Sequence, residues 1–315
     1  MYFPIANIEI NPFIPPVVAF VISFFTSMGG VSGAFLLLPF QVSVLGFNSP
    51  AVSATNQLFN IVAIPSGIYR YIKEGRMVWP LTWVVIIGTL PGVLIGAIIR
   101  IQYLPDPRNF KMFVGLILLY IGSRLLKDIL KGKRNKKGEL SVDEKFQKLN
   151  KEFNSKHREV DKQLPKVIVI EFSLTRISYD FYGQEFKINT IGVMTLSAIV
   201  GIIGGVYGIG GGAIIAPLFI SYFGLPVYTV AGAALMGTFV TSIAGVIFYQ
   251  IIAPFYPNIV ISPDWLLGIL FGLGGFGGMY FGARAQKYVP AKVIKWILAA
   301  CIIFISAKYI ISFFL

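Results

Sequence analysis

The stretch Gly205-Val-Tyr-Gly-Ile-Gly-Gly-Gly-Ala-Ile-Ile-Ala-Pro217 lies deep inside an apolar run of membrane length. Glycine has no side chain and destabilises a helix interior by about 1 kcal/mol relative to alanine. A cluster of glycines inside such a run therefore predicts a break in the helix. Broken backbone at membrane depth must be satisfied by protein or by a water-filled cavity, so we interpret the break as half of a binding site.

The composition around this stretch is that of an integral membrane protein. The 315 residues are 56% hydrophobic and only 13% charged, whereas a soluble domain carries about 25% charged residues. In a soluble protein the net charge of +13 would suggest a nucleic-acid partner. Here most basic residues fall between apolar segments, so we expect them to hold loops at the cytoplasmic side and expect no nucleic-acid partner.

Eight apolar segments divide the chain, and two of them are too long for a simple crossing. They are about 13–45, 51–69, 78–99, 112–126, 189–223, 227–252, 264–283 and 293–315. A 35-residue helix would be about 52 Å long, against a hydrocarbon core of about 30 Å. Both overlong segments, the first and the fifth, carry glycine clusters in the middle. We expect an all-α polytopic membrane protein in which segments 1 and 5 are broken or re-entrant.

The two halves of the chain repeat each other. With an offset of 178 and no gap, positions 30–71 align with 208–249 and share nine identities in 42 positions. Chance in such an apolar composition would give on the order of three. The identical positions are Gly30, Gly33, Pro39, Ser43, Gly46, Val52, Val62, Gly67 and Tyr71 with their partners 178 residues later. We therefore divide the chain into an N-terminal membrane repeat, 1–126, a polar insert, 127–188, and a C-terminal membrane repeat, 189–315.

The distribution of basic residues favours inverted pseudo-symmetry. If segments 1 and 5 both re-enter, the basic loops 70–76, 124–188 and 284–295 are all cytoplasmic, and only loop 100–111 violates the positive-inside rule. If both segments cross, loop 284–295 becomes a second violation. We expect a multi-pass protein of the cell membrane with the insert in the cytoplasm.

The insert has the pattern of a small α+β unit. Apolar residues at 3/4 spacing over 142–164 predict an amphipathic helix, and the alternation over 167–188 predicts a strand followed by a hairpin with its turn at 182–184. We interpret the insert as a cap on the membrane part. A regulatory role has no specific support in the sequence.

The two breaks together predict an anion site. Each starts a helix whose first N–H groups lack intrahelical partners and carry the positive end of the macrodipole. Two such ends aimed at one point bind an anion without a full positive charge, which the bilayer would penalise. The expected backbone donors are Gly30, Ser32, Gly33, Gly208, Gly210 and Gly211, and the expected polar side chains are Asn56, Gln57, Asn60 and Thr238.

Other polar and small residues have simpler explanations. Close helix packing accounts for Gly67, Gly96, Gly245 and the series at 272–282. The arginines that flank segments, Arg70, Arg100 and Arg284, are orientation anchors in preference to an anion funnel. We expect no enzyme activity, cofactor or metal, because the apolar segments lack an acid, a base and any metal-ligand cluster, and the glycines follow no strand of a dinucleotide fold.

The doubled motif resembles a known family. The stretches Gly30-Val-Ser-Gly33…Pro39 and Gly208-Ile-Gly-Gly211…Pro217, one in each half of an eight-segment chain, resemble the TauE/SafE family, also called the 4-toluene sulfonate uptake permease family. The resemblance covers about 16–126 and 189–315. It implies transport of sulfite, sulfoacetate, thiosulfate or another sulfur-containing anion. Ser32 and Ala34 stand where the second repeat has Gly210 and Gly212, which implies an asymmetric site, and the insert is longer than the usual central loop of the family.

We therefore expect a transporter of a small anion that works by alternating access between the two repeats in the lipid bilayer. The alternatives are an anion channel and a membrane scaffold for the insert. The mid-membrane segments hold no carboxylate, so a coupling proton would ride on the substrate or a counter-ion would serve instead. The substrate, the direction of transport and the oligomeric state are open at this stage.

Overall fold

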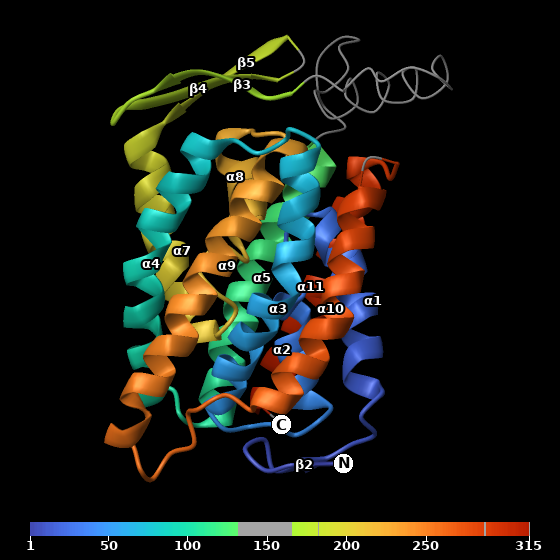
Figure 1. The fold of residues 1–315 in the computed structure, drawn as a ribbon, viewed down its shortest axis with the longest axis vertical. Coiled ribbons are helices and arrows are strands. Elements are labelled where there is room, and N and C mark those ends of the chain that lie inside the picture. The colour runs from blue at the N-terminus through green and yellow to red at the C-terminus, as the bar shows by residue number, and fades with distance from the viewer. Residues whose placement is uncertain (132–165, 182, 287, 315) are drawn as a thin grey trace.

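Helices make up most of the protein, as the computed structural model shows for residues 1–131, 166–181, 183–286 and 288–314 (Figure 1). Most helices run roughly parallel to the long axis and form one bundle. In chain order they are α1 Ile14–Met28, α2 Ala34–Ser43, α3 Ala51–Lys73, α4 Trp79–Gln102, α5 Pro107–Lys131, α7 Thr190–Tyr207, α8 Ile215–Phe223, α9 Val227–Ile252, α10 Trp265–Ala285 and α11 Ala291–Phe314, with a 3-10 turn, η2, at Ala253–Phe255.

Five spans among the described residues are long and apolar enough to cross a bilayer. They are Trp79–Gln102, Pro107–Lys127, Thr190–Tyr207, Val227–Phe255 and Trp265–Ala285. The 23-residue helix α3 is as long, but it carries the polar run Thr55–Gln57 and Asn60. The chain is thus a multi-pass helical membrane protein. The count of eight spanning segments and the division into domains stay predictions.

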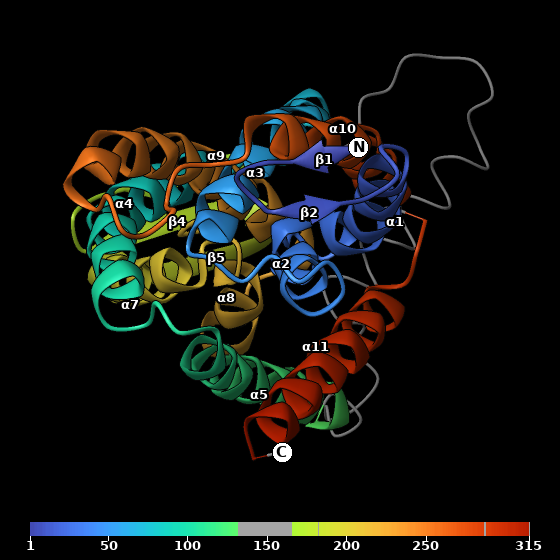
Figure 2. The ribbon, with the colours of Figure 1, turned by 90° about the horizontal axis from the view of Figure 1, so that it is seen from below.

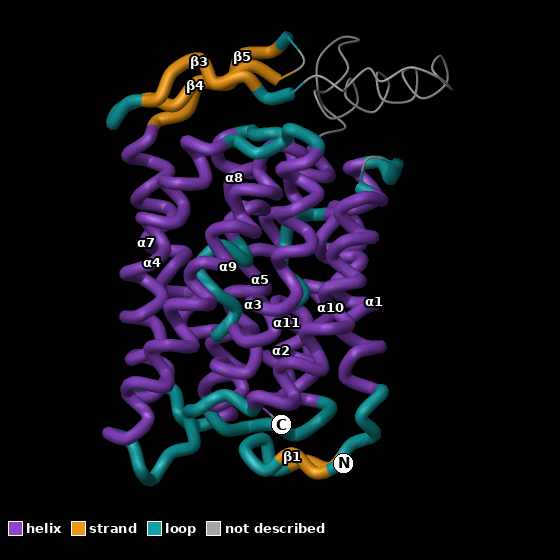
Figure 3. Tube along the Cα trace, viewed as in Figure 1, coloured by secondary structure: helices purple, strands orange, loops and turns teal. Residues whose placement is uncertain are grey.

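The predicted helix breaks are present at both glycine clusters. The chain leaves helical geometry between α1 and α2 and again between α7 and α8. Gly30 has a φ of +70° and Gly208 a φ of +77°. This left-handed conformation costs any other L-residue about 1–2 kcal/mol. After each break the second, shorter helix runs back toward the end from which the first one came (Figures 1 and 3).

Equivalent residues of the two halves make the same backbone hydrogen bonds. The N–H of Val31 donates to the carbonyl of Thr26, and the N–H of Ile209 donates to that of Gly204, with the offset of 178 at both positions. The same offset relates the bond from Gly30 to Ser27 with that from Gly208 to Gly205, and the bond from Phe47 to Gln41 with that from Leu225 to Phe219. The repeat detected in the sequence is therefore also a repeat of local conformation.

Two glycine ladders bring helices into close contact. Gly88, Gly92 and Gly96 of α4 face α7, and Gly274, Gly278 and Gly282 of α10 face α1. A Cβ at Gly92 would lie 2.7 Å from the carbonyl oxygen of Ala198, and one at Gly278 would lie 2.3 Å from that of Phe20. Because the obstacle is backbone, the packing explanation is confirmed for Gly96 and for these members of the series at 272–282, and Gly88 and Gly92 extend it.

The polar parts lie at opposite ends of the bundle. At one end, which we call the insert face, β3 (Ile168–Phe172), β4 (Arg176–Phe181) and β5 (Gln184–Asn189) form an antiparallel sheet. The Tyr179 hydroxyl hydrogen-bonds to Thr229 of α9 at 2.9 Å and ties the sheet to the bundle. The predicted strand and hairpin are thus present, whereas the helix expected at 142–164 lies outside the described residues.

The other end, which we call the N-terminal face, carries both chain termini and the short pair β1 (Tyr2–Phe3) and β2 (Ile8–Glu9) (Figures 1 and 3). This pair is fixed to α10 because the N–H of Ala6 donates to Asp264, the N-cap residue of that helix. Seen from this face, α5 and α11 pack side by side at one edge of the bundle (Figure 2).

Candidate functional site

The side chain of Asn60 joins the two helix breaks. It lies fully buried on α3, and its Nδ2 donates to the carbonyl of Ile209 at 2.9 Å and to Oγ of Ser242 at 3.1 Å. Its Oδ1 accepts a hydrogen bond from the hydroxyl of Ser32. One carboxamide therefore contacts the loop after α1, the loop after α7, and α9.

Asn56, one helical turn earlier, makes a second set of links. Its Nδ2 donates to the carbonyls of Ala34 and Gly208, both at 3.1 Å. Its Oδ1 accepts from Nε2 of Gln41 at 3.2 Å. A carbonyl at the start of α2 and a carbonyl at the break after α7 are thus satisfied by the same side chain, which fixes the two loops relative to α3.

Several backbone donors in the two loops lack partners. In the described part of the chain, the N–H groups of Ser32, Gly33, Gly210 and Gly212 take part in none of the hydrogen bonds, although all four residues are buried. The N–H of Gly211 donates to Oγ1 of Thr241 at 2.9 Å. Buried N–H groups without partners are rare in proteins, and donors at a helix start are suited to an anion.

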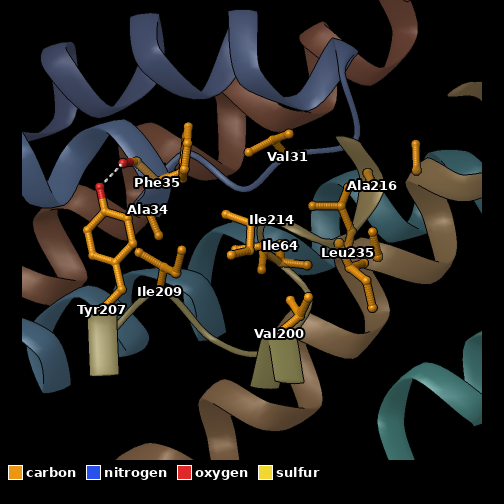
Figure 4. Close-up of a cluster of buried hydrophobic side chains, with 14 of the residues drawn as sticks. Val31, Ala34, Phe35, Ile64, Val200, Tyr207, Ile209, Ile214, Ala216 and Leu235 are labelled. Atoms are coloured by element: carbon orange, nitrogen blue, oxygen red, sulfur yellow. Dashed lines mark hydrogen bonds between the residues drawn. The ribbon is translucent and has the colours of Figure 1, made fainter. Parts of the chain in front are cut away.

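The network around Asn56 and Asn60, with the unpartnered N–H groups of the two loops, is called the polar centre below. Apolar side chains surround it. Figure 4 shows Val31 of the first loop facing Ile214 of the second, with Ile64 of α3 beside them. On the α7 side, the hydroxyl of Tyr207 donates to the carbonyl of Phe35 at 2.9 Å (Figure 4). Such walls keep water out and lower the local dielectric, which strengthens each hydrogen bond and dipole inside them.

The polar centre contains no charged side chain. The buried charged residues of the described chain are Arg76, Arg100 and Asp264. Arg76 follows α3 at the insert face, while Arg100 and Asp264 lie near helix ends toward the N-terminal face. The polarity of the centre therefore comes from carboxamides, hydroxyls and backbone dipoles. Among the described residues, no three His, Cys, Asp or Glu side chains gather as metal ligands would.

Comparison with known proteins agrees with this geometry. The family model described as sulfite exporter TauE/SafE matches residues 16–309. The chain belongs to this family.

As a TauE/SafE member, the chain is a membrane transporter by family. It is also similar to the probable membrane transporter protein YunE of Bacillus subtilis (strain 168), with 21% identity over 248 residues that cover 78% of this chain and 75% of the relative. No solved structure matches the chain.

The structure brings most of the predicted site residues of this TauE/SafE protein together. Ser32, Asn56, Asn60 and Gly208 share one hydrogen-bond network, and Gly210 and Gly211 lie in the second loop beside it. Three others make packing contacts outside this network. Gly30 packs on Ala231, Gly33 packs on Ser23 and Phe59, and Gln57 faces Gly245 of α9. A role of any of these residues in binding stays a prediction.

Thr238 lies beside the second loop, but its hydroxyl donates to the carbonyl of Ala234, within its own helix, at 2.8 Å. A Cβ at Gly212 would lie 2.8 Å from that hydroxyl oxygen, so Thr238 forms part of the wall.

Three residues of the polar centre were not among the predicted site residues. Gln41 bonds to Asn56, Ser242 accepts from Asn60, and Thr241 accepts from Gly211. Gln41 is a lone amide in an apolar helix, and Ser242 lies one turn after Thr238. Both signals were present in the sequence, yet single hydroxyls and amides in apolar helices usually serve helix packing.

Proposed function

We propose that this protein transports a small sulfur-containing oxyanion, such as sulfite, thiosulfate or an organosulfonate, through a site between the two helix breaks. The observation that carries the proposal is the Asn60 carboxamide, which bridges both loops beside four buried N–H groups without partners. The family name and the similarity to a probable membrane transporter support the same class of function.

The proposed chemistry follows from the donors. An oxyanion offers several oxygens, and the N–H groups of the two loops that precede α2 and α8 can each bond to one of them. Partial charges of about half a unit at each helix end stabilise the anion without a buried cation. Binding through dipoles also leaves the ion free to depart, because no full charge has to be separated from it.

We further propose that transport proceeds by alternating access between two inverted halves. Support comes from the offset of 178 that relates the hydrogen bonds at both breaks, since duplicated halves of transporters place the substrate at their interface. The basic loops of the insert face favour the cytoplasm for that face, with the protein in the cell membrane. A proton carried by the substrate, or a counter-ion, would supply any coupling.

The test is uptake of [35S]sulfite and [35S]thiosulfate into liposomes that contain the purified protein. We expect Asn60→Ala to lower kcat/KM at least tenfold, because it removes the bridge between the loops. The matched control is Ser66→Ala on the same helix, which loses a hydrogen bond to the carbonyl of Phe276 on α10 and none to either break. Equal uptake by the Asn60→Ala variant and the wild type would overturn the proposed site.

Two alternatives are decided by further measurements. A channel shows no acceleration when unlabelled anion is placed on the trans side, whereas a carrier shows counterflow. A scaffold for the insert needs the insert, so residues 132–165 are replaced by a short Gly/Ser linker while β3–β5 are kept. Retained anion flux in that variant excludes the scaffold function.

A further inference from the structure

Among the described residues, Arg100 is the one guanidinium that lies fully buried inside a candidate membrane span, where it contacts the start of α5. It lies on α4 with no exposed surface, and its Nη1 donates to the carbonyl of Leu104. Its Nε and Nη2 atoms are buried and have no hydrogen-bond partner. A role as an orientation anchor does not explain this position, because the side chain of Arg100 turns inward instead of reaching the lipid surface.

The charge of Arg100 is not neutralised by a carboxylate. The ion pairs among the described residues join Arg70 and Arg76 to Glu74 and Lys187 to Glu185, and none includes Arg100. The guanidinium carbon lies 3.9 Å from the centroid of the Phe110 ring. This cation–π contact offsets only part of the cost of burying a charge without a counter-ion. A bound anion would supply the missing charge.

A column of unpartnered polar groups lies on α3, and Tyr249 of α9 lies between this column and Arg100. The side-chain polar atoms of Ser53 and Gln57, four residues apart on α3, are buried without a hydrogen-bond partner, as is the hydroxyl of Ser49 just before the helix. Residues at this spacing lie on one face of a helix. The hydroxyl of Tyr249 on α9 is also buried, and it lies beside the hydroxyl of Ser53 and close to Arg100.

We propose that Arg100, Ser53, Tyr249 and Gln57 form a second anion site, between the N-terminal face and the centre. Its ligand class is the sulfur oxyanion of the proposed function, on which this inference rests. The Arg100 guanidinium binds two oxygens through Nε and Nη2, the fork geometry that arginine presents to oxyanions. The two hydroxyls and the Gln57 amide bind the remaining oxygens.

The second site adjoins the polar centre on one side. A Cβ at Gly208 would lie 2.3 Å from that of Ser53, so the break after α7 is in contact with the column. Asn56, which bonds to the carbonyl of Gly208, is the neighbour of Gln57 in the sequence. The proposed second site and the unpartnered N–H groups are therefore neighbours along α3.

On the other side, the second site adjoins the surface. Leu104 and Phe110, which both contact Arg100, are close in sequence to Asp106, Arg108 and Lys111, which line a cavity of about 340 Å³. It is lined by Asn48, Asp106, Pro107, Arg108, Lys111, Ser312 and Phe313. Two cations against one carboxylate give this entrance a net positive lining, which attracts anions. Attraction of anions to this entrance would explain why loop 100–111 is basic although it violates the positive-inside rule.

The stoichiometry of [35S]thiosulfate binding to the purified protein, measured by equilibrium dialysis, tests the second site. We expect two thiosulfates per wild-type chain, one per Arg100→Gln chain and one per Asn60→Ala chain. The matched control is Arg124→Gln. Like Arg100, Arg124 stacks on an aromatic ring, that of Tyr222, and it donates to Ser221. We expect this variant to bind two thiosulfates. Size-exclusion chromatography checks that each variant is folded.

The outcomes separate this inference from the proposed function. The second site is overturned if a folded Arg100→Gln chain still binds two thiosulfates. It is also overturned if the wild type binds a single thiosulfate and only Asn60→Ala abolishes that binding. Loss of a single wild-type site in Arg100→Gln but not in Asn60→Ala supports the second site and overturns the central one. If Arg100→Gln does not fold, Tyr249→Phe and Ser53→Ala remove single hydroxyls, and we expect each to weaken one of the two sites about threefold to tenfold. Unchanged affinity in both overturns the proposal.

Discussion

Alanine at Gly208, in the loop after α7, is destabilising for two reasons, the left-handed backbone conformation and the crowding of the added Cβ, and comparison with Gly224→Ala separates them. Gly208 has a φ of +77°, and an added Cβ would lie 2.3 Å from Cβ and 2.5 Å from Cα of Ser53. Gly224 has a φ of +65° with nothing within 4 Å of an added Cβ. Gly224→Ala therefore reports the left-handed conformation alone, whereas Gly208→Ala reports the conformation and the crowding.

The expected magnitudes follow from these contacts. The left-handed conformation costs about 1–2 kcal/mol for alanine. Crowding in a packed interior adds about 1–3 kcal/mol, which gives a total of about 2–5 kcal/mol for Gly208→Ala. The obstacle includes the backbone Cα of Ser53, so a second substitution, Ser53→Gly, relieves little of the crowding.

The assay is thermal unfolding of the purified protein in detergent, followed by tryptophan fluorescence, together with counterflow of sulfite. We expect Gly208→Ala to melt below Gly224→Ala by about 2–4 °C for each kcal/mol of crowding. We also expect Gly208→Ala to lose flux, because the carbonyl of Gly208 moves away from Asn56. Equal melting temperatures for the two variants, or full rescue by Ser53→Gly, would refute the reasoning.

Two further predictions concern packing and the insert face. Gly278→Ala should abolish stable insertion, because its Cβ would lie 2.3 Å from a backbone oxygen of α1. Gly67→Ala, whose nearest contact would be at 3.4 Å, should accumulate like the wild type. Quantitative immunoblots of membranes compare the amounts of the two variants. Gln286→Ala should lower the Tm, because it removes hydrogen bonds to Tyr71, Arg76 and Met28 that contribute about 0.5–1.5 kcal/mol each. Similar melting of Gln286→Ala and the wild type would contradict this view of the insert face.

Much of the local structure was predictable because its causes are local. Glycine clusters inside overlong apolar runs predict helix breaks, since the cost of glycine in a helix depends on the residue and its immediate neighbours. The offset of 178 predicted which positions correspond, and Gly30 and Gly208 share a left-handed φ. The packing role of the glycine series at 272–282 followed from the same composition.

Only the tertiary structure decided which side chains meet. Asn56 and Gln57 are neighbours in the sequence, yet a helix turns by about 100° per residue, so Asn56 bonds to the breaks while Gln57 faces Gly245 of α9. Arg100 has the sequence position of an anchor at a segment end. Its burial depends on Phe110 and on Tyr249, about 150 residues away, which no local pattern specifies. The sequence determined where the helices break and that both halves break alike. The packing of α3, α4 and α9 decided which polar groups meet at the polar centre and around Arg100.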